Sequence, residues 1–491
     1  MRSTLSLVLV LALAGACGSR DSSAEHKSDK PIVGAVPARS PMAPPKPAAD
    51  KPVEPKPEPV KTLKVPPAKK RLFSKWVRSL RLRRSISVRL EPKEGSKKLG
   101  TVAAGTRVLW KSAQRSTGCP TRWIEIEPRG WICERYLAPD KKSAFAREQP
   151  KLKRGEMLPG AYGKVIVDTD EDEDAKAKTY TYKNNVLKEA RELEGSVTVR
   201  LYGDHKVIDE KSYWHIGGKE YLPIENVREH RPSKFRGIRL GDDTGHVLPL
   251  GFVMSRKNYG HRVVVYKTSK LNRPVRKLKA RAIVKVLERV AKKSGKSHAY
   301  RIGEDQWVKA AEIHVARKVA PPPMTLSTER WFDVDLTEQV MVAYEGSTPV
   351  YTTMVSTGVR KHPTIPGIFR IWLKFSETDM KGQMEDEAPY SVSHVPWTQY
   401  YAKDFALHTA YWHDVFGLRK SHGCVNLTPL DSRFFYFWSD PQVPPGWTMA
   451  NGISEQPGSM VRVHSRDAPN PEFVGYAKEV YEARKRAAAS N

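Results

Sequence analysis

The chain has 491 residues, which at about 100 to 200 residues per domain allows three or four domains. Lysine and arginine number 84 against 54 acidic residues, a formal net charge of 84 − 54 = +30, and hydrophobic residues make up 39%. This composition excludes a polytopic membrane protein. One apolar segment, residues 5–16 behind Arg2, is too short to span a bilayer and predicts a secretory signal.

The signal segment ends in small residues directly before a cysteine, Leu13 to Cys17, which resembles the lipobox of bacterial lipoproteins. The resemblance implies a lipoprotein-type signal peptide over residues 1–17 and a lipid on Cys17. With Gly18 next, it implies a periplasmic protein anchored to the outer membrane of a Gram-negative cell. Ala14 stands where the lipobox prefers leucine, so cleavage elsewhere by the ordinary signal peptidase stays open. In that compartment the positive charge meets anionic lipid and wall polymers, and we expect no nucleic-acid partner.

Residues 18–75 are predicted to be a tether rich in proline and lysine, since residues 31–67 alone contain 12 prolines. Such a segment favours extended polyproline II and could reach about 160 Å from a lipid anchor. A tail without a spacing role remains the alternative. At the other end, residues 467–491 are predicted to be a polar helical tail, for which we state no function.

Short apolar runs bounded by glycine, proline and charged turns predict three small β modules, over residues 76–142, 143–235 and 236–322. Residues 280–293 are the one stretch there with helical periodicity. The modules share apolar positions at offsets of five and six, which favours a degenerate repeat. These positions are Ile126, Trp131 and Leu137; Ile216, Tyr221 and Val227; Ile302, Trp307 and Ile313.

The first module carries the most informative pattern. Its runs are Ile86 to Arg89, Leu99-Gly100, Gly105 to Val108, Trp123-Ile124 and Gly130 to Ile132. They resemble the bacterial Src-homology-3-like (SH3-like) domain, a small β-barrel that often binds cell wall. A plain spacer whose aromatic residues form the core is an equal alternative. The two later segments resemble the domain only near their final strands.

The four cysteines divide by position. Cys17 belongs to the lipobox, and Cys119 and Cys133 both lie in the first module, where an oxidising compartment favours a disulfide. Cys424 is left without a partner in the sequence, which makes it a candidate reactive thiol.

Cys424 lies in Ser421-His422-Gly423-Cys424-Val425-Asn426, and His408 precedes it by 16 residues. A thiol of ordinary pKa, about 8.5, is mostly protonated at neutral pH, so a nucleophilic cysteine needs a neighbouring imidazole. His408 is the candidate base, although His413 and His422 are near enough in sequence to compete. Gly423 allows close approach of a carbonyl, and amides at Gly423 and Cys424 are candidate oxyanion donors.

The motif with its distant histidine resembles the signature of the L,D-transpeptidase (YkuD-type) catalytic domain. Upstream runs support it: two predicted strands from Trp331 to Val342 with a turn near Thr337, Val355 to Gly358, and Thr364 to Phe369. Thr364-Ile365-Pro366-Gly367 departs from the family's commoner order in one turn. The resemblance covers about residues 328–465, and we place the catalytic domain at residues 326–466. Together with the SH3-like resemblance it implies a mainly β fold, with SH3-like barrel modules followed by a β-sandwich with few helices.

The resemblance also implies a mechanism without a cofactor or metal. Cys424 attacks a donor tetrapeptide stem of peptidoglycan, releases D-alanine and forms a thioester, which an acceptor amine resolves into a 3→3 cross-link. His408 moves the protons, and the Thr409 carbonyl orients its ring. Ser421, His422, Gly423 and Asn426 shape the site. Many relatives have arginine in place of Asn426, so a role for it in binding a substrate carboxylate is not transferred.

Candidate cleft residues are the aromatic side chains Tyr390, Trp397 and Trp412, with core packing as the alternative. A zinc site built from histidines and Cys424 is a second enzymatic reading, although its spacing fits no common zinc motif. The acidic run at residues 168–174 lacks the glycine and final glutamate of a calcium loop and is predicted to be a solvated loop. A non-catalytic wall-binding lipoprotein, an L,D-carboxypeptidase and a protein-to-wall ligase remain alternative functions.

Overall fold

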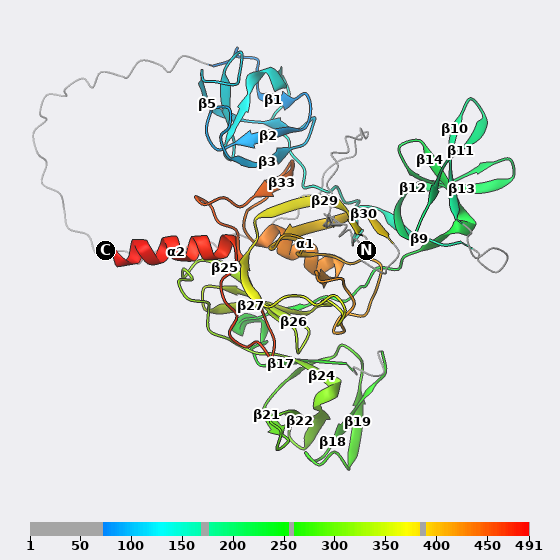
Figure 1. Cartoon of the computed structure of the whole chain (residues 1–491), viewed down its shortest axis with the longest axis vertical. Helices are drawn as coiled ribbons and strands as arrows, with labels where there is room; N and C mark the ends of the chain where they lie inside the picture. The colour runs from blue at the N-terminus through cyan, green and yellow to red at the C-terminus, as the bar shows by residue number, and fades with distance from the viewer. Residues whose placement is uncertain (1–71, 168–175, 255–259, 383–388, 491) are drawn as a thin grey trace, which may run out of the picture.

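The computed structural model describes residues 72–167, 176–254, 260–382 and 389–490. The predicted signal peptide with Cys17, most of the tether and the acidic run lie outside these ranges. The described part is mainly β, with 34 strands and two α-helices. Within it, neither helix is long and apolar enough to cross a membrane. Figure 1 shows a central body, surrounded by three smaller groups of strands that correspond to the predicted modules.

The first β module, residues 72–140, forms two ladders of antiparallel strands. One ladder has the order β4-β1-β8 and the other β3-β2-β7-β6-β5. No described pairing joins the ladders into a closed barrel, so the SH3-like assignment stays a prediction. The strands are β1 (Ser79–Leu82), β2 (Ile86–Arg89), β3 (Lys98–Val102), β4 (Arg107–Val108), β5 (Trp110–Gln114), β6 (Trp123–Ile126), β7 (Trp131–Cys133) and β8 (Leu137–Asp140).

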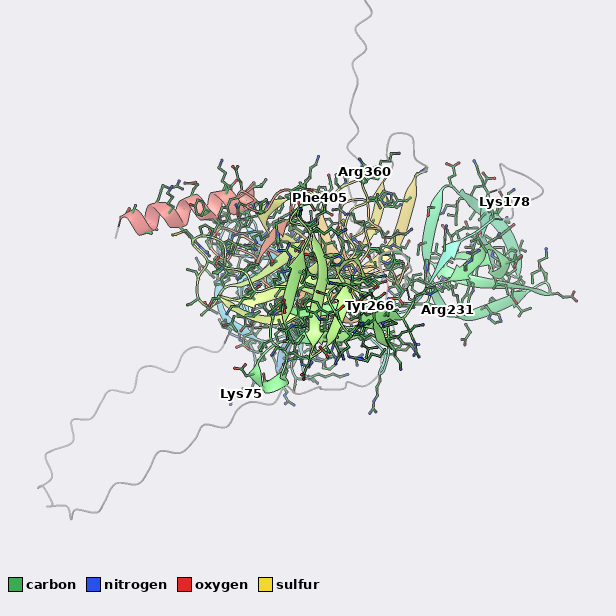
Figure 2. All side chains as sticks on the ribbon, turned by 90° about the horizontal axis from the view of Figure 1, so that it is seen from below. Lys75, Lys178, Arg231, Tyr266, Arg360 and Phe405 are labelled. Carbon is green, nitrogen blue, oxygen red and sulfur yellow. A yellow bond between two sulfur atoms is a disulfide. The ribbon has the colours of Figure 1, made fainter. Side chains whose placement is uncertain are left out.

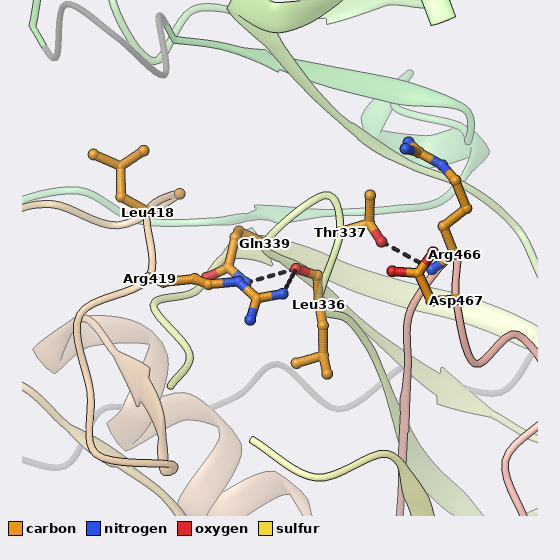
Figure 3. A pocket seen from close by; sticks show the side chains of 8 residues that line it. Leu336, Thr337, Gln339, Leu418, Arg419, Arg466 and Asp467 are labelled. Carbon is orange, nitrogen blue, oxygen red and sulfur yellow. Dashed lines mark hydrogen bonds between the residues drawn. The ribbon is translucent and has the colours of Figure 1, made fainter. Parts of the chain in front are cut away.

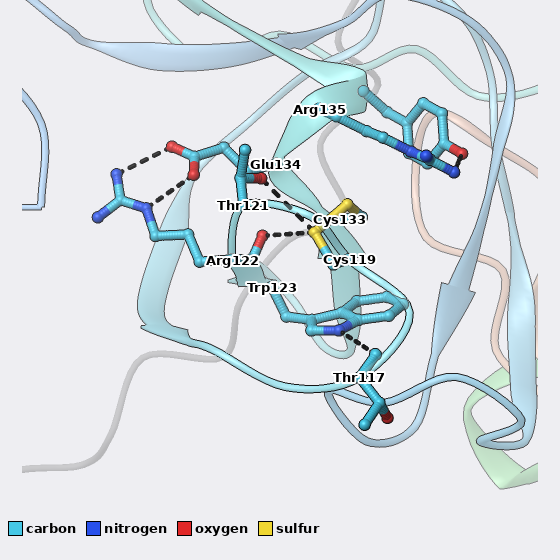
Figure 4. Close-up of a disulfide and its surroundings, with 9 residues drawn as sticks. Thr117, Cys119, Thr121, Arg122, Trp123, Cys133, Glu134 and Arg135 are labelled. Atoms are coloured by element: carbon cyan, nitrogen blue, oxygen red, sulfur yellow. Dashed lines mark hydrogen bonds and ion pairs between the residues drawn. A yellow bond between two sulfur atoms is a disulfide. The ribbon is translucent and has the colours of Figure 1, made fainter.

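A disulfide joins Cys119 to Cys133 within this module (Figure 4). Beside it, Trp123 Nε1 donates to the Thr117 carbonyl at 3.0 Å, and Arg122 pairs with Glu134 at 2.8 Å. The bond ties the loop before β6 to the end of β7. It therefore fastens the outer end of the module, where few other side chains are buried.

The second β module, residues 161–229, is a set of mostly antiparallel hairpins around a small apolar core. Its strands are β9 (Ala161–Val165), β10 (Ala177–Lys183), β11 (Val186–Leu193), β12 (Ser196–Ile208), β13 (Lys211–Gly217), β14 (Glu220–Pro223) and β15 (Val227–Glu229). Figure 2 shows this module, with Lys178, at one side of the body. The module therefore has a core of its own and touches the body along one side.

The third β module, residues 238–316, combines a three-stranded and a five-stranded sheet, and its first strand, β16, belongs to the six-stranded sheet of the central body. Its strands are β16 (Ile238–Arg239), β17 (Leu250–Val253), β18 (Val263–Tyr266), β19 (Pro274–Leu278), β20 (Ile283–Lys285), β21 (Glu288–Ala291), β22 (Ser297–Gly303), β23 (Gln306–Lys309) and β24 (Ile313–Ala316). Strands β20 and β21 occupy residues 283–291, so the helical periodicity expected there was wrong. Sheet pairing on both strands overrides the weak local pattern.

The predicted repeat spacing coincides with the same local structure in all three modules, a strand, one 3-10 turn and a strand. The turns are η1 (Glu134–Tyr136), η2 (Ile224–Asn226) and η4 (Ala310–Glu312). A further turn, η3 (Asp242–Thr244), lies outside this pattern. The shared aromatic position therefore lies on the strand before the turn in each copy.

The central body, residues 330–464, is a sandwich of two sheets. One is a six-stranded sheet of order β16-β27-β26-β25-β34-β28, and the other contains β29 to β33. Its strands are β25 (Arg330–Asp335), β26 (Val340–Glu345), β27 (Thr348–Met354), β28 (Gly367–Arg370), β29 (Leu373–Gly382), β30 (Tyr390–Tyr400), β31 (Ala406–Thr409), β32 (Val425–Leu427), β33 (Trp447–Asn451) and β34 (Met460–His464). The strands predicted on either side of Thr337 correspond to β25 and β26.

Helix α1 (Pro429–Trp438) follows β32 directly and packs on the sandwich core. Thr428 caps its N-terminus by accepting from the Asp431 amide, and proline occupies the first turn. At its other end the buried Lys374 donates from Nζ to the carbonyls of Tyr436 and Ser439, at 2.8 and 2.6 Å. Both ends are therefore satisfied, which fixes the helix behind the strand that carries the catalytic motif. Helix α2 (Tyr476–Ala489) projects from the body (Figures 1 and 2), at the place predicted for a polar helical tail.

Each module adds a strand to the central body. Strand β3 pairs with β33, β12 pairs in parallel with β30, and β16 pairs with β27. At the first of these ladders a Cβ on Gly100 would lie 2.2 Å from the Met449 carbonyl oxygen and 2.4 Å from the Trp447 ring. Glycine is therefore required for the first module to approach this closely.

We expect Gly100→Val to lower the free energy of unfolding by about 2 kcal/mol, because the added side chain overpacks the ladder between β3 and β33. Thr101→Val is the matched control, since Thr101 is the next residue on β3 and points to the opposite face. Thermal unfolding of both variants measures the difference. Equal stability of the two variants would contradict the ladder.

Candidate active site

Strand β31 carries His408, and Cys424 directly precedes the neighbouring strand β32. The two strands are parallel neighbours in which His408 lies opposite Asn426. Alternate residues of a strand share a face, so if the strand geometry continues by one residue, Cys424 projects on the same side as Asn426 and His408. The register of the two short strands places Asn426 beside His408 and is the reason to expect the thiol on the same face.

Cys424 is half-buried and takes part in no disulfide. Its Sγ lies 3.6 Å from the Asp404 carbonyl oxygen. Burial raises the pKa of Tyr401 well above its ordinary value, and the charge of a Cys424 thiolate adds to that rise, so the phenol lies near the thiol. Tyr401 was not predicted from the sequence.

The turn before the cysteine is held by hydrogen bonds. Gly423 has φ +118°, and a Cβ there would lie 2.3 Å from the Phe405 ring. Ser421 Oγ donates to the Cys424 carbonyl at 2.5 Å and accepts from the Gly423 amide at 3.2 Å. The Gly423 amide is thus engaged within the turn, and its role as an oxyanion donor stays a prediction. Ser421 and Gly423 hold the shape of this turn through these contacts.

His408 is almost fully buried. Its Nδ1 lies 2.9 Å from the Thr409 carbonyl oxygen, the partner that the sequence resemblance implied. If Nδ1 donates this bond, Nε2 carries the lone pair that accepts a proton. Burial lowers the pKa of His408 to about 4, while the bond to Thr409 opposes the shift, so the ring is a neutral base at physiological pH. Trp412 stacks on the ring with centroids 5.8 Å apart.

The two competing histidines have other surroundings. His413 Nε2 is hydrogen-bonded to the Asn426 amide at 3.0 Å. Burial lowers the pKa of His413 to about 3, helped by the positive charge of Lys420. His422 is exposed and stacks on Tyr390, with ring centroids 5.2 Å apart. Asn426 therefore holds a second histidine beside the site, a contact that the sequence did not indicate.

The three aromatic residues predicted to line the cleft lie in different environments. Tyr390 and Trp412 are half-buried and stack on His422 and His408 respectively. Trp397 is fully buried in the apolar core that also contains residues of the first β module, so it has a packing role and is no candidate for substrate contact. The sequence alone could not distinguish core packing from substrate contact, because a large aromatic side chain occurs in both places.

The family model of the L,D-transpeptidase catalytic domain, YkuD, matches residues 329–475 of this chain. Residues 329–475 thus make up a YkuD L,D-transpeptidase catalytic domain.

Solved structures of L,D-transpeptidases also match the chain. A mutant enzyme from Enterococcus faecium is 23% identical over 28% of this chain and 49% of its own, with a TM-score of 0.22. The enzyme from Stackebrandtia nassauensis is 25% identical over 28% of this chain and 57% of its own, with a TM-score of 0.20. The enzyme from Mycobacterium smegmatis is 18% identical over 32% of this chain and 72% of its own, with a TM-score of 0.23. The chain thus spans about half the length of the first two, and no curated protein matches it.

Gln339 and Thr357 form hydrogen bonds that support the loop before Cys424. The Gln339 side chain accepts from the Thr357 amide at 2.9 Å and donates to its hydroxyl at 2.6 Å. The Thr357 carbonyl in turn accepts from the amides of Lys420 and Ser421. A cavity of about 340 Å³ lies beside these hydrogen bonds. Gln339 and Arg419 are among the residues that line it (Figure 3).

The zinc alternative needs its ligands to converge. Within the described ranges no group of three or more His, Cys, Asp or Glu side chains is placed to hold a metal ion. His413 faces Asn426 and His422 faces Tyr390, so the histidines around Cys424 point to different partners. The described residues therefore give the zinc alternative no converging set of ligands.

We expect Thr364→Val to lower the free energy of unfolding by about 1 to 3 kcal/mol. The Thr364 hydroxyl donates to the Gly423 carbonyl at 2.6 Å and accepts from the Gly358 amide at 2.8 Å, and valine leaves both buried groups unpaired. Thr364→Ser keeps the hydroxyl and is the control. Urea unfolding of the three proteins compares them, and an equal loss in both variants would contradict the hydroxyl's role.

The low pKa of His408 predicts that its ring titrates near pH 4, well below the ordinary value of about 6.5. Because the unfolded chain takes up this proton first, the His408 contribution to stability is complete above pH 6.5 and is lost as the pH falls towards 4. Histidine ring resonances followed by NMR measure the midpoint, with His408→Gln used to assign the signal. A midpoint near 6.5 would contradict the burial of the ring.

Proposed function

We propose that the protein is a peptidoglycan L,D-transpeptidase that forms 3→3 cross-links through a thioester on Cys424. The observation that carries the proposal is the pairing of β31 with β32 within the YkuD domain. It supports the proposal because His408, whose ring is buried and neutral, lies on the strand next to the one that Cys424 directly precedes.

In the first half-reaction the Cys424 thiol loses its proton to His408 Nε2, and the sulfur attacks the carbonyl at the L-centre of diaminopimelate in the donor stem. The carbon-sulfur bond forms as the bond to D-alanine breaks. The leaving amine takes the proton from His408. D-Alanine departs and the stem remains as a thioester.

In the second half-reaction an acceptor amine from a neighbouring stem attacks the thioester. His408 accepts the amine proton, the new amide bond forms and the carbon-sulfur bond breaks. The proton returns to sulfur, so the enzyme ends as it began. Water in place of the amine gives a carboxypeptidase, and an amine on a protein gives a protein-to-wall ligase.

The rest of the chain fits an exported enzyme in this proposal. The lipobox-like segment supports a lipid on Cys17, a periplasmic location and contact with the outer membrane. The long tether supports reach from that membrane to peptidoglycan. The shared strand-turn-strand units support SH3-like character of the β modules. We infer no nucleic-acid partner.

We predict that the full chain converts disaccharide-tetrapeptide into a cross-linked dimer with release of D-alanine. Cys424→Ala should reduce the rate at least about a thousandfold, because it removes the nucleophile. Mass spectrometry of the products measures both, and unchanged thermal unfolding shows that the variant is folded.

The products decide between the alternatives. A dimer that depends on Cys424 supports transpeptidation, whereas tripeptide alone points to hydrolysis. Unchanged substrate with the wild-type protein, together with retention of Cys424→Ala on purified wall, would instead favour a wall-binding lipoprotein.

A further inference from the structure

The second β module pairs with the YkuD domain next to the catalytic loop. In a parallel ladder, Ser196 of β12 lies opposite Tyr390 of β30, and the Ser196 amide donates to the Pro389 carbonyl at 2.9 Å. A Cβ on Gly195 would lie 2.1 Å from that carbonyl oxygen. Backbone contact this close fixes the start of β30 on the module.

This ladder sets the position of an aromatic ring at the site. Tyr390, which lies in the ladder, stacks on His422 with an interplanar angle of 19°. His422 is two residues before Cys424. The module therefore bears on the catalytic loop through one backbone ladder and one ring contact.

A second path leads from the module to the candidate base. The rings of Tyr162 on β9 and Tyr411 stack at 3.9 Å, the shortest spacing among the described ring pairs. Tyr411 meets Trp412 edge to face at 5.0 Å, and Trp412 stacks on His408. Close-packed rings transmit a displacement because they leave no room to absorb it.

An ion pair and two hydrogen bonds fasten the module between these paths. Arg200 Nη1 donates to Glu377 Oε1 on β29 at 2.8 Å. The Tyr202 hydroxyl lies 3.2 Å from His394 Nε2, and the Tyr162 hydroxyl donates to the His394 carbonyl at 3.2 Å. The guanidinium and carboxylate are only 16% and 23% exposed, so removal of Arg200 would leave a buried carboxyl group without its partner.

We propose that the second β module is a positioning part of the active site. It holds Tyr390 against His422, and through Tyr162 and Tyr411 it holds Trp412 against His408. Tyr162 and Arg200 are thus positioning residues on a module that contributes no catalytic residue. The inference goes beyond the proposed function and depends on it only where turnover is measured.

The test compares Tyr162→Ala, Tyr162→Phe and Arg200→Ala in the full chain. Tyr162→Ala removes the stack on Tyr411, whereas Tyr162→Phe keeps the ring and loses only the hydroxyl. Arg191→Ala is the matched control, because Arg191 pairs with Glu220 inside the same module, in an exposed ion pair at 2.9 Å. Thermal unfolding of each variant reports on folding.

Two readouts are used. The first is kcat for D-alanine release, which we expect to fall about tenfold in Tyr162→Ala and Arg200→Ala with little change in KM. We expect Tyr162→Phe to retain most of the rate and Arg191→Ala all of it. The second readout is the NMR position of the His408 ring signal, which depends on the stacked Trp412 and requires no turnover. It should shift in Tyr162→Ala and stay in place in Arg191→Ala.

The His408 signal separates the two proposals. If the wild-type protein releases no D-alanine, the proposed function fails while the signal still tests the module. An unmoved His408 signal in folded Tyr162→Ala would overturn the positioning role, as would an unchanged kcat in an active enzyme. Equal losses in Tyr162→Ala and Arg191→Ala would assign the effect to general destabilisation and overturn it too.

Discussion

The parallel pairing of β31 with β32 is the constraint on which the candidate site depends. Fifteen residues lie between His408 and Cys424, and they bring the chain back so that β31 and β32 lie side by side in one sheet. A slip of one residue would turn the cysteine to the opposite face. Helix α1, capped at both ends, follows β32 at once and holds the strand against the sandwich core.

The same packing that hides His408 explains its chemistry. Desolvation disfavours the imidazolium, and the Thr409 carbonyl orients the ring without supplying a full negative charge. The His408 ring is therefore neutral, and its described hydrogen-bond partner is a backbone carbonyl, not a carboxylate. A backbone oxygen has the further advantage that it moves only if the strand moves, so ring orientation and strand register are linked.

Much of the site was accessible from the sequence, because the motif is local. Cys424, the turn before it and the His408 to Thr409 contact depend on residues close together in the chain or in a known motif. The role of Trp397 was not accessible, since an aromatic side chain in a strand gives the same pattern in a core and in a cleft. The contact between Asn426 and His413 was missed because it crosses a loop.

The fold was predictable in its kind but not in its assembly. Alternation of apolar residues indicated strands, and the spacing of Ile302, Trp307 and Ile313 marked one copy of the strand-turn-strand unit. The helix expected around residues 280–293 was wrong because two short strands that follow each other in the chain imitate a helical period. The ladders joining modules to the YkuD domain are made by backbone atoms, so no side-chain pattern indicates them. Gly100 on β3, Gly195 just before β12 and Gly237 just before β16 lie where a Cβ would meet a backbone oxygen of the central body.

Those ladders also affect how the protein behaves at high concentration. A chain with 34 described strands presents many backbone donors and acceptors, and an exposed strand edge is a template for aggregation. Strands β3, β12 and β16 each cover an edge of a central sheet that would otherwise face solvent. Loss of a module would therefore do more than shorten the protein: it would uncover an adhesive edge, so these additions also protect the YkuD domain from association with other copies of itself.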